Sequence, residues 1–210
     1  SCGAIFDFMD YLQTDVTNWN RVKEILRDSD STYLYEVIDP VNDPHIIEYN
    51  SQHLVLLDKV KNQIAFSKTP YKELAENDAD FTLAVKEHAA TLNTWQEFLD
   101  FYTKASMPGY KYGNEYIEGF VFEDAAGFMT KLKTDYYSKW KHMRSVADSV
   151  RRWGYIQNTA QLTDAVENAF YGFLREKYNQ DESFRNYKQQ RGYDIITLRK
   201  QFFAERGEPV

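Results

Sequence analysis

The chain has 210 residues and a formal net charge of −7, and 43% of its residues are hydrophobic. That is enough apolar material for one large domain or two small ones, and no part of the sequence is low-complexity or collagenous. The single cysteine, Cys2, excludes an internal disulfide framework and suits a reducing cytoplasm, while no apolar run reaches the ~18–20 residues of a membrane span.

The first 60 residues predict one helix and then three strands. Residues 18–27 place apolar side chains at i, i+3 and i+4, which is typical of an amphipathic helix. Residues 33–38 are aromatic and branched and predict a strand, and the proline-containing segment 39–44 predicts a turn. Two more strands are expected at 45–49 and 53–60, the second apolar on both faces and therefore central in a sheet.

The pattern turns helical between residues 70 and 104. Asp80 is a suitable cap for a helix through Ala90, and Asn93 or Thr94 for a second helix.

Further along, residues 105–116 predict a loop, and 117–123 and 128–134 predict two strands joined by a turn. Everything after this point has a helical pattern, most clearly 163–178. The sequence therefore predicts an α+β fold with a boundary near residue 135.

Two lysines define the first candidate site. Residues i and i+2 of a strand share a face, so Lys131 and Lys133 are expected to project together. Two neighbouring ammonium groups favour an anion between them, such as a nucleotide phosphate. The alternative is an edge strand protected by lysines.

Three further residues extend this site. Glu118 lies on the expected partner strand, where a carboxylate can hold a divalent metal on phosphate oxygens or form a cross-strand ion pair. Gly119 permits a close approach to the backbone, or marks a bulge. Glu36 can accept a ribose hydroxyl while the neighbouring Tyr35 stacks on a base, or its strand can simply face water.

A basic stretch follows the two lysines. Between Lys131 and Arg152 the sequence has seven basic residues and two acidic ones. If 135–152 is a helix, Lys141, Arg144 and Arg151 fall near one face. This face can bind an RNA backbone or can merely be solvated.

Taken together, these segments resemble the covalent nucleotidyltransferases, most closely the RNA ligase 1 type of T-even phages. The similarity runs from about Ser1 to His142, and its last block is the most specific because six positions of its pattern fit at once. In chain order the matching blocks are Tyr35–Ile38, Pro40–Asn42, Ile46–Tyr49, Leu54–Leu57, Glu118–Val121 and Lys131–Tyr137.

The resemblance implies an ATP- and Mg²⁺-dependent enzyme that seals RNA ends, including those of cleaved tRNA, in the cytoplasm of a bacterial or phage-infected cell. A lysine would attack the α-phosphate of ATP, AMP would move to an RNA 5′-phosphate, and a 3′-hydroxyl would displace it. Lys131 and Lys133 would neutralise the phosphate and Glu118 would place Mg²⁺. Glu36 would hold the ribose, and Tyr137 matches a position important for ligation.

On this basis residues 1–134 are expected to be the C-terminal part of an adenylyltransferase domain with an antiparallel sheet and flanking helices. Residues 135–210 are expected to form a helical region that recognises RNA or tRNA.

The sequence departs from the family in two places. After the Pro-x-Asn turn, Asp43-Pro44-His45 stands where an arginine usually follows. The nucleophile motif Lys-x-Asp-Gly is absent, because none of the nine glycines follows an aspartate. We therefore expect a preceding segment to carry the lysine, and this chain alone to be inactive in lysine adenylylation. The alternatives are a non-catalytic RNA-binding module with a ligase-like fold, or a helical interaction protein.

Overall fold

The structure is a computed structural model that describes residues 30–40, 44–76, 84–186 and 193–208, together with residues 20, 23 and 27. Of the helix predicted at 18–27, residues 20, 23 and 27 are described and are helical, and residues 41–43 of the predicted turn lie outside the described residues. The described residues form two compact units. Unit 1 comprises those of Ser1–Asp43 and Tyr49–Thr91, and unit 2 those of Pro44–Glu48 and Leu92–Val210.

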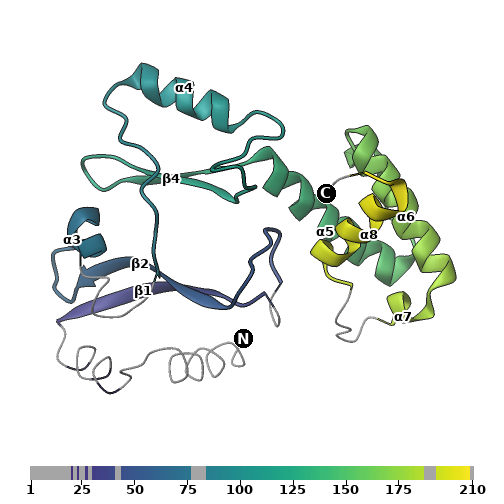
Figure 1. Ribbon diagram of the computed structural model, residues 1–210, viewed down its shortest axis with the longest axis horizontal. Helices are drawn as coiled ribbons and strands as arrows, with labels where there is room; N and C mark the ends of the chain where they lie inside the picture. The colour runs from purple at the N-terminus through teal and green to yellow at the C-terminus, as the bar shows by residue number, and fades with distance from the viewer. Residues whose placement is uncertain are drawn as a thin grey trace. The chain divides into compact units, whose positions relative to one another are not determined.

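Unit 1 is built on a three-stranded sheet in the order β1-β2-β3 (Figure 1). Strand β1 (Ser31–Ile38) pairs antiparallel with β2 (His53–Lys61), and β2 pairs parallel with the short β3 (Ala84–Val85). One short helix, α3 (Tyr71–Glu76), lies between β2 and β3 in sequence. The central position of β2 confirms the prediction from its apolar sequence.

Strand β2 alternates buried with half-buried side chains. Leu54 and Leu56 are buried on one face, and Asp58 follows them on the same face. The Asp58 carboxylate lies 2.9 Å from Lys68 Nζ and 3.7 Å from Lys86 Nζ. These two ammonium groups compensate the cost of burying its charge.

The strand predicted at 45–49 is absent, and this prediction was wrong. Residues 44–50 form no ladder with any described strand, and Pro44–Glu48 belong to unit 2. Ile46 and Ile47 are buried as expected of a strand, but Ile46 packs into the core of the helices. The apolar pair correctly predicted that this segment is buried, but it wrongly predicted that the segment pairs with a strand.

The helix predicted through Ala90 was also wrong in its described part. Residues 84–85 form β3 and residues 86–93 have no regular structure. A backbone hydrogen bond from Lys86 N to Leu56 O, 3.0 Å long, holds the chain against β2 instead. The tertiary pairing with β2 thus overrides the local helical preference.

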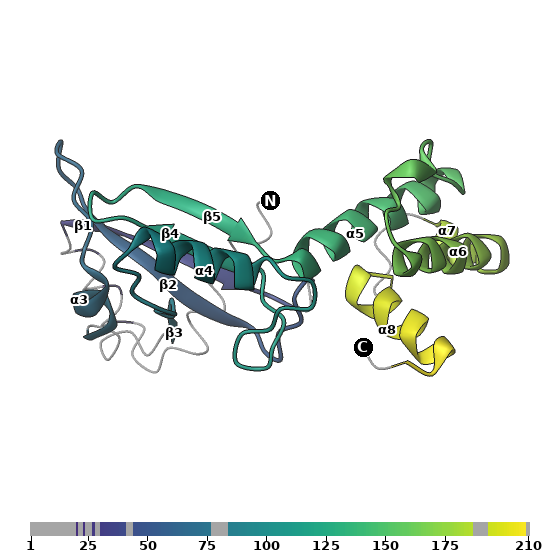
Figure 2. The same cartoon turned by 90° about the horizontal axis from the view of Figure 1, so that it is seen from above.

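In unit 2 a helix covers a β-hairpin. Helix α4 (Trp95–Ala105) is capped by Thr94, one of the two caps predicted, in a capping box with Glu97. Strand β4 (Gly119–Glu123) pairs antiparallel with β5 (Met129–Lys133), as predicted. Phe98 and Phe101 of α4 make edge-to-face contacts with Phe122 and Phe120 of β4. Figure 2 shows α4 along the hairpin.

The rest of unit 2 is helical, as predicted after Thr134. Its helices are α5 (Asp135–Trp153), α6 (Ala165–Gln180), α7 (Glu182–Arg185) and α8 (Ile195–Arg206), with a 3-10 turn at Thr159–Gln161. Within the described residues, no helix is both long enough and apolar enough to cross a membrane.

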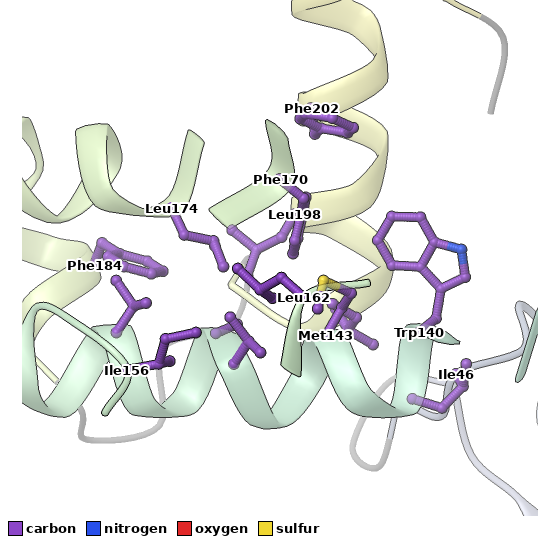
Figure 3. Close-up of a cluster of buried hydrophobic side chains, with 14 residues drawn as sticks. Ile46, Trp140, Met143, Ile156, Leu162, Phe170, Leu174, Phe184, Leu198 and Phe202 are labelled. Atoms are coloured by element: carbon purple, nitrogen blue, oxygen red, sulfur yellow. The ribbon is translucent and has the colours of Figure 1, made fainter. Parts of the chain in front are cut away.

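One face of α5 packs into the helical core. Trp140, Met143, Val146, Ala147 and Val150 recur at helical spacing and are buried. Figure 3 shows Ile46, from the segment between β1 and β2 in sequence, next to Trp140. The other buried members of this core are Ile156, Leu162, Phe170, Leu174, Phe184, Ile195, Leu198 and Phe202.

The chain is therefore α+β, with small antiparallel-rich sheets, flanking helices and a helical C-terminal region. The compact units divide after Thr91, so the β4–β5 hairpin shares a unit with the C-terminal helices. The predicted division into a catalytic part (1–134) and a helical region (135–210) stays a prediction.

Candidate functional site

Three of the predicted site residues meet where β5 runs into α5. Lys133 Nζ forms an ion pair with Glu118 Oε1 and lies 5.1 Å from the centre of the Tyr137 ring. The side chains of Lys133 and Glu118 are 40% and 32% exposed. The cluster is therefore open to a ligand, while its members hold one another in place.

Thr134 connects the three residues of this cluster. Its amide donates to Glu118 O (3.0 Å), its hydroxyl donates to Ile117 O (2.7 Å), and the same hydroxyl accepts from Tyr137 N (3.2 Å). Thr134 is 1% exposed and caps α5. This role was not predicted from the sequence, although a threonine followed by aspartate at the start of a helix is a recognisable cap.

Gly119 stands opposite Lys133 in the β4–β5 register. Its φ is +155°, and a Cβ at this position would lie 1.9 Å from Leu132 O. The close approach predicted for this glycine is therefore made by the partner strand. The register shows no shift at this position, so the alternative of a bulge does not apply.

Lys131 shares the face of Lys133, as predicted from their spacing. Both are exposed, whereas Leu132 between them is buried on the opposite face. Among the described residues, Lys131 has no ion-pair partner. Its cross-strand neighbour is Val121, which is 57% exposed. Lys131 therefore adds an uncompensated positive charge beside the Glu118–Lys133 pair.

The Tyr137 phenol is held in its neutral form. Burial raises its pKa, and the charge of Glu118 and a hydrogen bond to Glu118 raise it further, while Lys133 and Arg144 act in the opposite direction. A neutral phenol can donate a hydrogen bond to the carboxylate.

The remaining two nucleotide-site candidates belong to unit 1. Tyr35 and Glu36 are adjacent on β1, so their side chains point to opposite faces of the sheet. Glu36 is exposed, whereas Tyr35 is partly buried, and burial raises its pKa. A ligand bound on the face of Glu36 therefore does not meet the ring of Tyr35.

The three predicted RNA-binding residues of α5 differ in accessibility. Lys141 and Arg144 are exposed, and Lys141 Nζ lies 5.7 Å from the centre of the Tyr137 ring. Arg151 is largely buried: its Nη2 donates to Tyr193 O (2.6 Å), and its guanidinium lies 5.2 Å from the Phe184 ring centre. Nη1 and Nη2 of Arg151 thus interact with groups of the protein itself.

A cavity of about 100 Å³ lies next to these arginines. Arg144 and Arg151 line it together with Asp148 and Asp194. Because the acidic and basic side chains balance, this cavity has no preference for an anion.

The described residues contain no group of three or more side chains that could hold a metal ion. Glu118 offers a single carboxylate. That suits Mg²⁺, which is commonly bound through one or two carboxylates together with substrate phosphates and water.

The profile of a family described as RNA ligase matches residues 6–137. The match covers more than half of the chain, which therefore belongs to the RNA ligase family of the T4 RNA ligase 1 type. No curated protein matched the chain significantly.

The matched segment ends at Tyr137, in the first turn of α5. It includes Glu118, Lys131, Lys133 and Tyr137, and also Glu36 in unit 1. Helices α6, α7 and α8 lie beyond the matched segment.

Proposed function

We propose that the chain is part of an ATP-dependent ligase that joins an RNA 5′-phosphate to a 3′-hydroxyl, with cleaved tRNA as one substrate, in the cytoplasm. The observation that carries this proposal is the Glu118–Lys133–Tyr137 cluster beside the uncompensated Lys131. A family match alone gives the class of enzyme, and these contacts supply the local chemistry.

Lys131 and Lys133 would bind the α-phosphate of ATP and neutralise the charge that builds on it during adenylyl transfer. Glu118 would contribute one oxygen to Mg²⁺, which supplies further neutralisation when bound. In the described cluster Glu118 and Lys133 compensate each other. Mg²⁺ bound to Glu118 would take the place of the positive charge of Lys133, and a phosphate bound to Lys133 would take the place of the negative charge of Glu118.

Glu36 would accept a hydrogen bond from a ribose hydroxyl, because it stands on an exposed strand face. Tyr35 is on the other face and would support the strand rather than stack on the same nucleotide. Tyr137 would orient Glu118 through its hydrogen bond.

The RNA strand would continue from the cluster along α5. Lys141 and Arg144 extend the positive charge of Lys133 past Tyr137. They would contact backbone phosphates, which gives affinity with little sequence preference. Arg151 would stabilise the helix packing that presents them.

The lysine that receives AMP would come from a Lys-x-Asp-Gly segment outside these 210 residues, which contain no such motif. That absence equally favours a second candidate, a non-catalytic RNA-binding module with a ligase-like fold. The two candidates differ in what a longer polypeptide, carrying the upstream coding sequence, should do.

The experiment compares the chain and the longer polypeptide, each incubated with labelled ATP and Mg²⁺ and separated under denaturing conditions. We expect label on the longer polypeptide alone, and sealing of 5′-phosphorylated RNA by it. Stable label on a lysine of the 210-residue chain would contradict the external nucleophile. A longer polypeptide that binds RNA but neither takes up label nor seals would establish the non-catalytic module.

A further inference from the structure

Four side chains of unit 2, two cations and two aromatic rings, form a column. Arg199 of α8 lies 5.3 Å from the Tyr136 ring centre, and Tyr136 stacks on Tyr116 with ring centres 3.7 Å apart and planes 4° from parallel. Lys111 Nζ closes the column 4.4 Å from the Tyr116 ring centre. Two cations thus enclose two stacked rings, which is favourable on both outer faces.

Arg199 is an unusual residue to find in a helical core. It is 2% exposed, its Nη1 donates to Ile46 O over 3.1 Å, and its guanidinium also lies 5.3 Å from the Trp140 ring. Its Nε has no hydrogen-bond partner among the described residues, and no carboxylate there forms an ion pair with it. Burying such a charge costs free energy, so a leucine would suit the core better on packing grounds alone.

The two rings of the column come from the segments that carry the candidate site. Tyr116 precedes Glu118 by two residues, and Tyr136 directly precedes Tyr137. Between them, the Thr134 hydroxyl and amide join the 117–118 backbone to the start of α5. The stacked rings therefore fix, from the side, the same two segments that Thr134 fixes through hydrogen bonds.

We propose that Arg199 is a positioning residue for Glu118 and Tyr137, which it aligns through the stacked rings of Tyr136 and Tyr116. This inference rests on the proposed ligase function for its catalytic consequence. It assigns α8, which lies outside the matched family segment, a role in the geometry of the phosphate site as well as in the helical core.

The first test uses the chain itself and needs no enzymatic activity. Hydrogen exchange is measured at the amides of Thr134 and Tyr137, whose hydrogen bonds report the junction. In Arg199→Lys, which keeps the charge and loses the planar guanidinium, we expect exchange at both amides to accelerate about tenfold, with Leu174 in the core changing less than about twofold.

Arg206→Lys is the matched control, because Arg206 lies on the same helix and contacts an aromatic ring, Phe202 at 5.3 Å, outside the column. We expect no acceleration at Thr134 or Tyr137 in this variant. Equal acceleration at Leu174 in Arg199→Lys, or none at the junction, would overturn the positioning role.

A second pair of variants changes Tyr116, the half-buried ring of the column. Tyr116→Leu removes the stacked ring, whereas Tyr116→Phe keeps it. In the longer ligase we expect Arg199→Lys and Tyr116→Leu to lower kcat by about 10–100-fold, since small misplacements of reacting groups have effects of this size. The KM values for ATP and RNA should stay within about threefold, and Tyr116→Phe should restore kcat.

The two tests separate the two proposals. Unchanged kcat in both ring-column variants would overturn the catalytic positioning even if the fold is perturbed. If the unmodified longer polypeptide does not seal RNA, the ligase proposal fails, and the exchange measurements still decide whether Arg199 holds the junction.

Discussion

Strand β1 and the β5–α5 junction both carry residues expected to bind a nucleotide, but they hold them differently. At the junction, Glu118, Lys133 and Tyr137 contact one another, and Thr134 fixes their backbone. On β1, Glu36 stands on an exposed face and, among the described residues, makes no ion pair or side-chain hydrogen bond.

The difference indicates two kinds of contribution to binding. The junction is preorganised, so a phosphate meets charges whose geometry the protein has already determined. Glu36 gains its geometry only when a ribose hydroxyl arrives, and the cost of ordering its side chain is then part of binding. Changes at the junction should therefore be coupled to one another, and changes at Glu36 should be independent of them.

The largest expected effect concerns the lysines. In the longer ligase, Lys131→Ala and Lys133→Ala should each lower sealing about 10²–10³-fold, because each removes a preorganised charge partner of the phosphate. The double variant Glu118→Ala/Lys133→Ala should lose less than the product of the single losses, while Glu36→Ala with Lys133→Ala should lose the full product. Single-turnover sealing rates measure both. Full multiplicativity at Glu118 and Lys133 would remove the proposed distinction.

The second prediction concerns the backbone of the junction. Gly119→Ala should lower the free energy of unfolding by about 3 kcal/mol, because its Cβ would collide with Leu132 O and its φ is unfavourable for alanine. Gly127→Ala, at φ +83° with nothing within 4 Å, is the control and should cost about 1 kcal/mol. Urea denaturation measures both, and equal losses would show that the contact at residue 119 is relieved by relaxation.

The third prediction tests the hydrogen bonds of Thr134. Thr134→Ala removes the cap of α5 and leaves Ile117 O without its donor, which should cost about 2 kcal/mol. Thr134→Ser keeps both bonds and should cost less than about 1 kcal/mol. Thermal and urea unfolding of the pair provide the comparison. A serine variant as unstable as the alanine variant would assign the effect to the lost methyl group.

The fourth prediction concerns pH. Burial and Glu118 raise the pKa of Tyr137 in the folded chain above its ordinary value near 10, so the stability contributed by its neutral phenol is present at lower pH and is lost as pH rises through the folded pKa. Glu118→Gln should lower this pKa and Lys133→Ala should raise it. Carbon-13 NMR of labelled tyrosine follows the titration, and shifts of the opposite sign would show that Glu118 and Lys133 do not control this phenol.

The smallest effect is expected on α5. Arg144→Ala should weaken RNA binding a few-fold and reduce the logarithmic salt slope by about 0.7, the loss of one phosphate contact to a single strand. Arg175→Ala, which removes an equally exposed charge from α6, is the control. Affinity for a short RNA across a salt series measures the slope. The same slope for both variants would mean that α5 carries no specific phosphate contact.

Local patterns predicted the junction well. Alternation of side chains placed Lys131 and Lys133 on one face, and the strand patterns at 117–123 and 128–134 predicted the hairpin that carries them. These features depend on neighbours within a few residues, so sequence spacing contains them. The contacts of Thr134 with the 117–118 backbone, and those of Arg199 with Ile46 and the Tyr136 ring, were missed because local spacing does not reveal them.

The segment at 45–49 shows a prediction from local pattern that failed because of a long-range contact. Its isoleucines predicted a strand because burial and strand pairing usually coincide in such short runs. Here the carbonyl of Ile46 is satisfied by Arg199, 153 residues away, so the segment is buried without a strand partner. Nothing within the segment itself distinguishes these outcomes.

The contact between Ile46 and Arg199 also bears on how the chain folds. Helical bundles usually fold fast because their contacts are local in sequence. In this core, however, the side chain of Ile46, from the first quarter of the chain, packs against helix α5. The backbone carbonyl of Ile46 accepts a hydrogen bond from Arg199 of α8, near the C-terminus. Closing a loop of this length precedes the last packing step, so unit 2 should refold more slowly than its helical content suggests. During synthesis, the hydrogen bond from Arg199 to the Ile46 carbonyl can form only after α8 has left the ribosome.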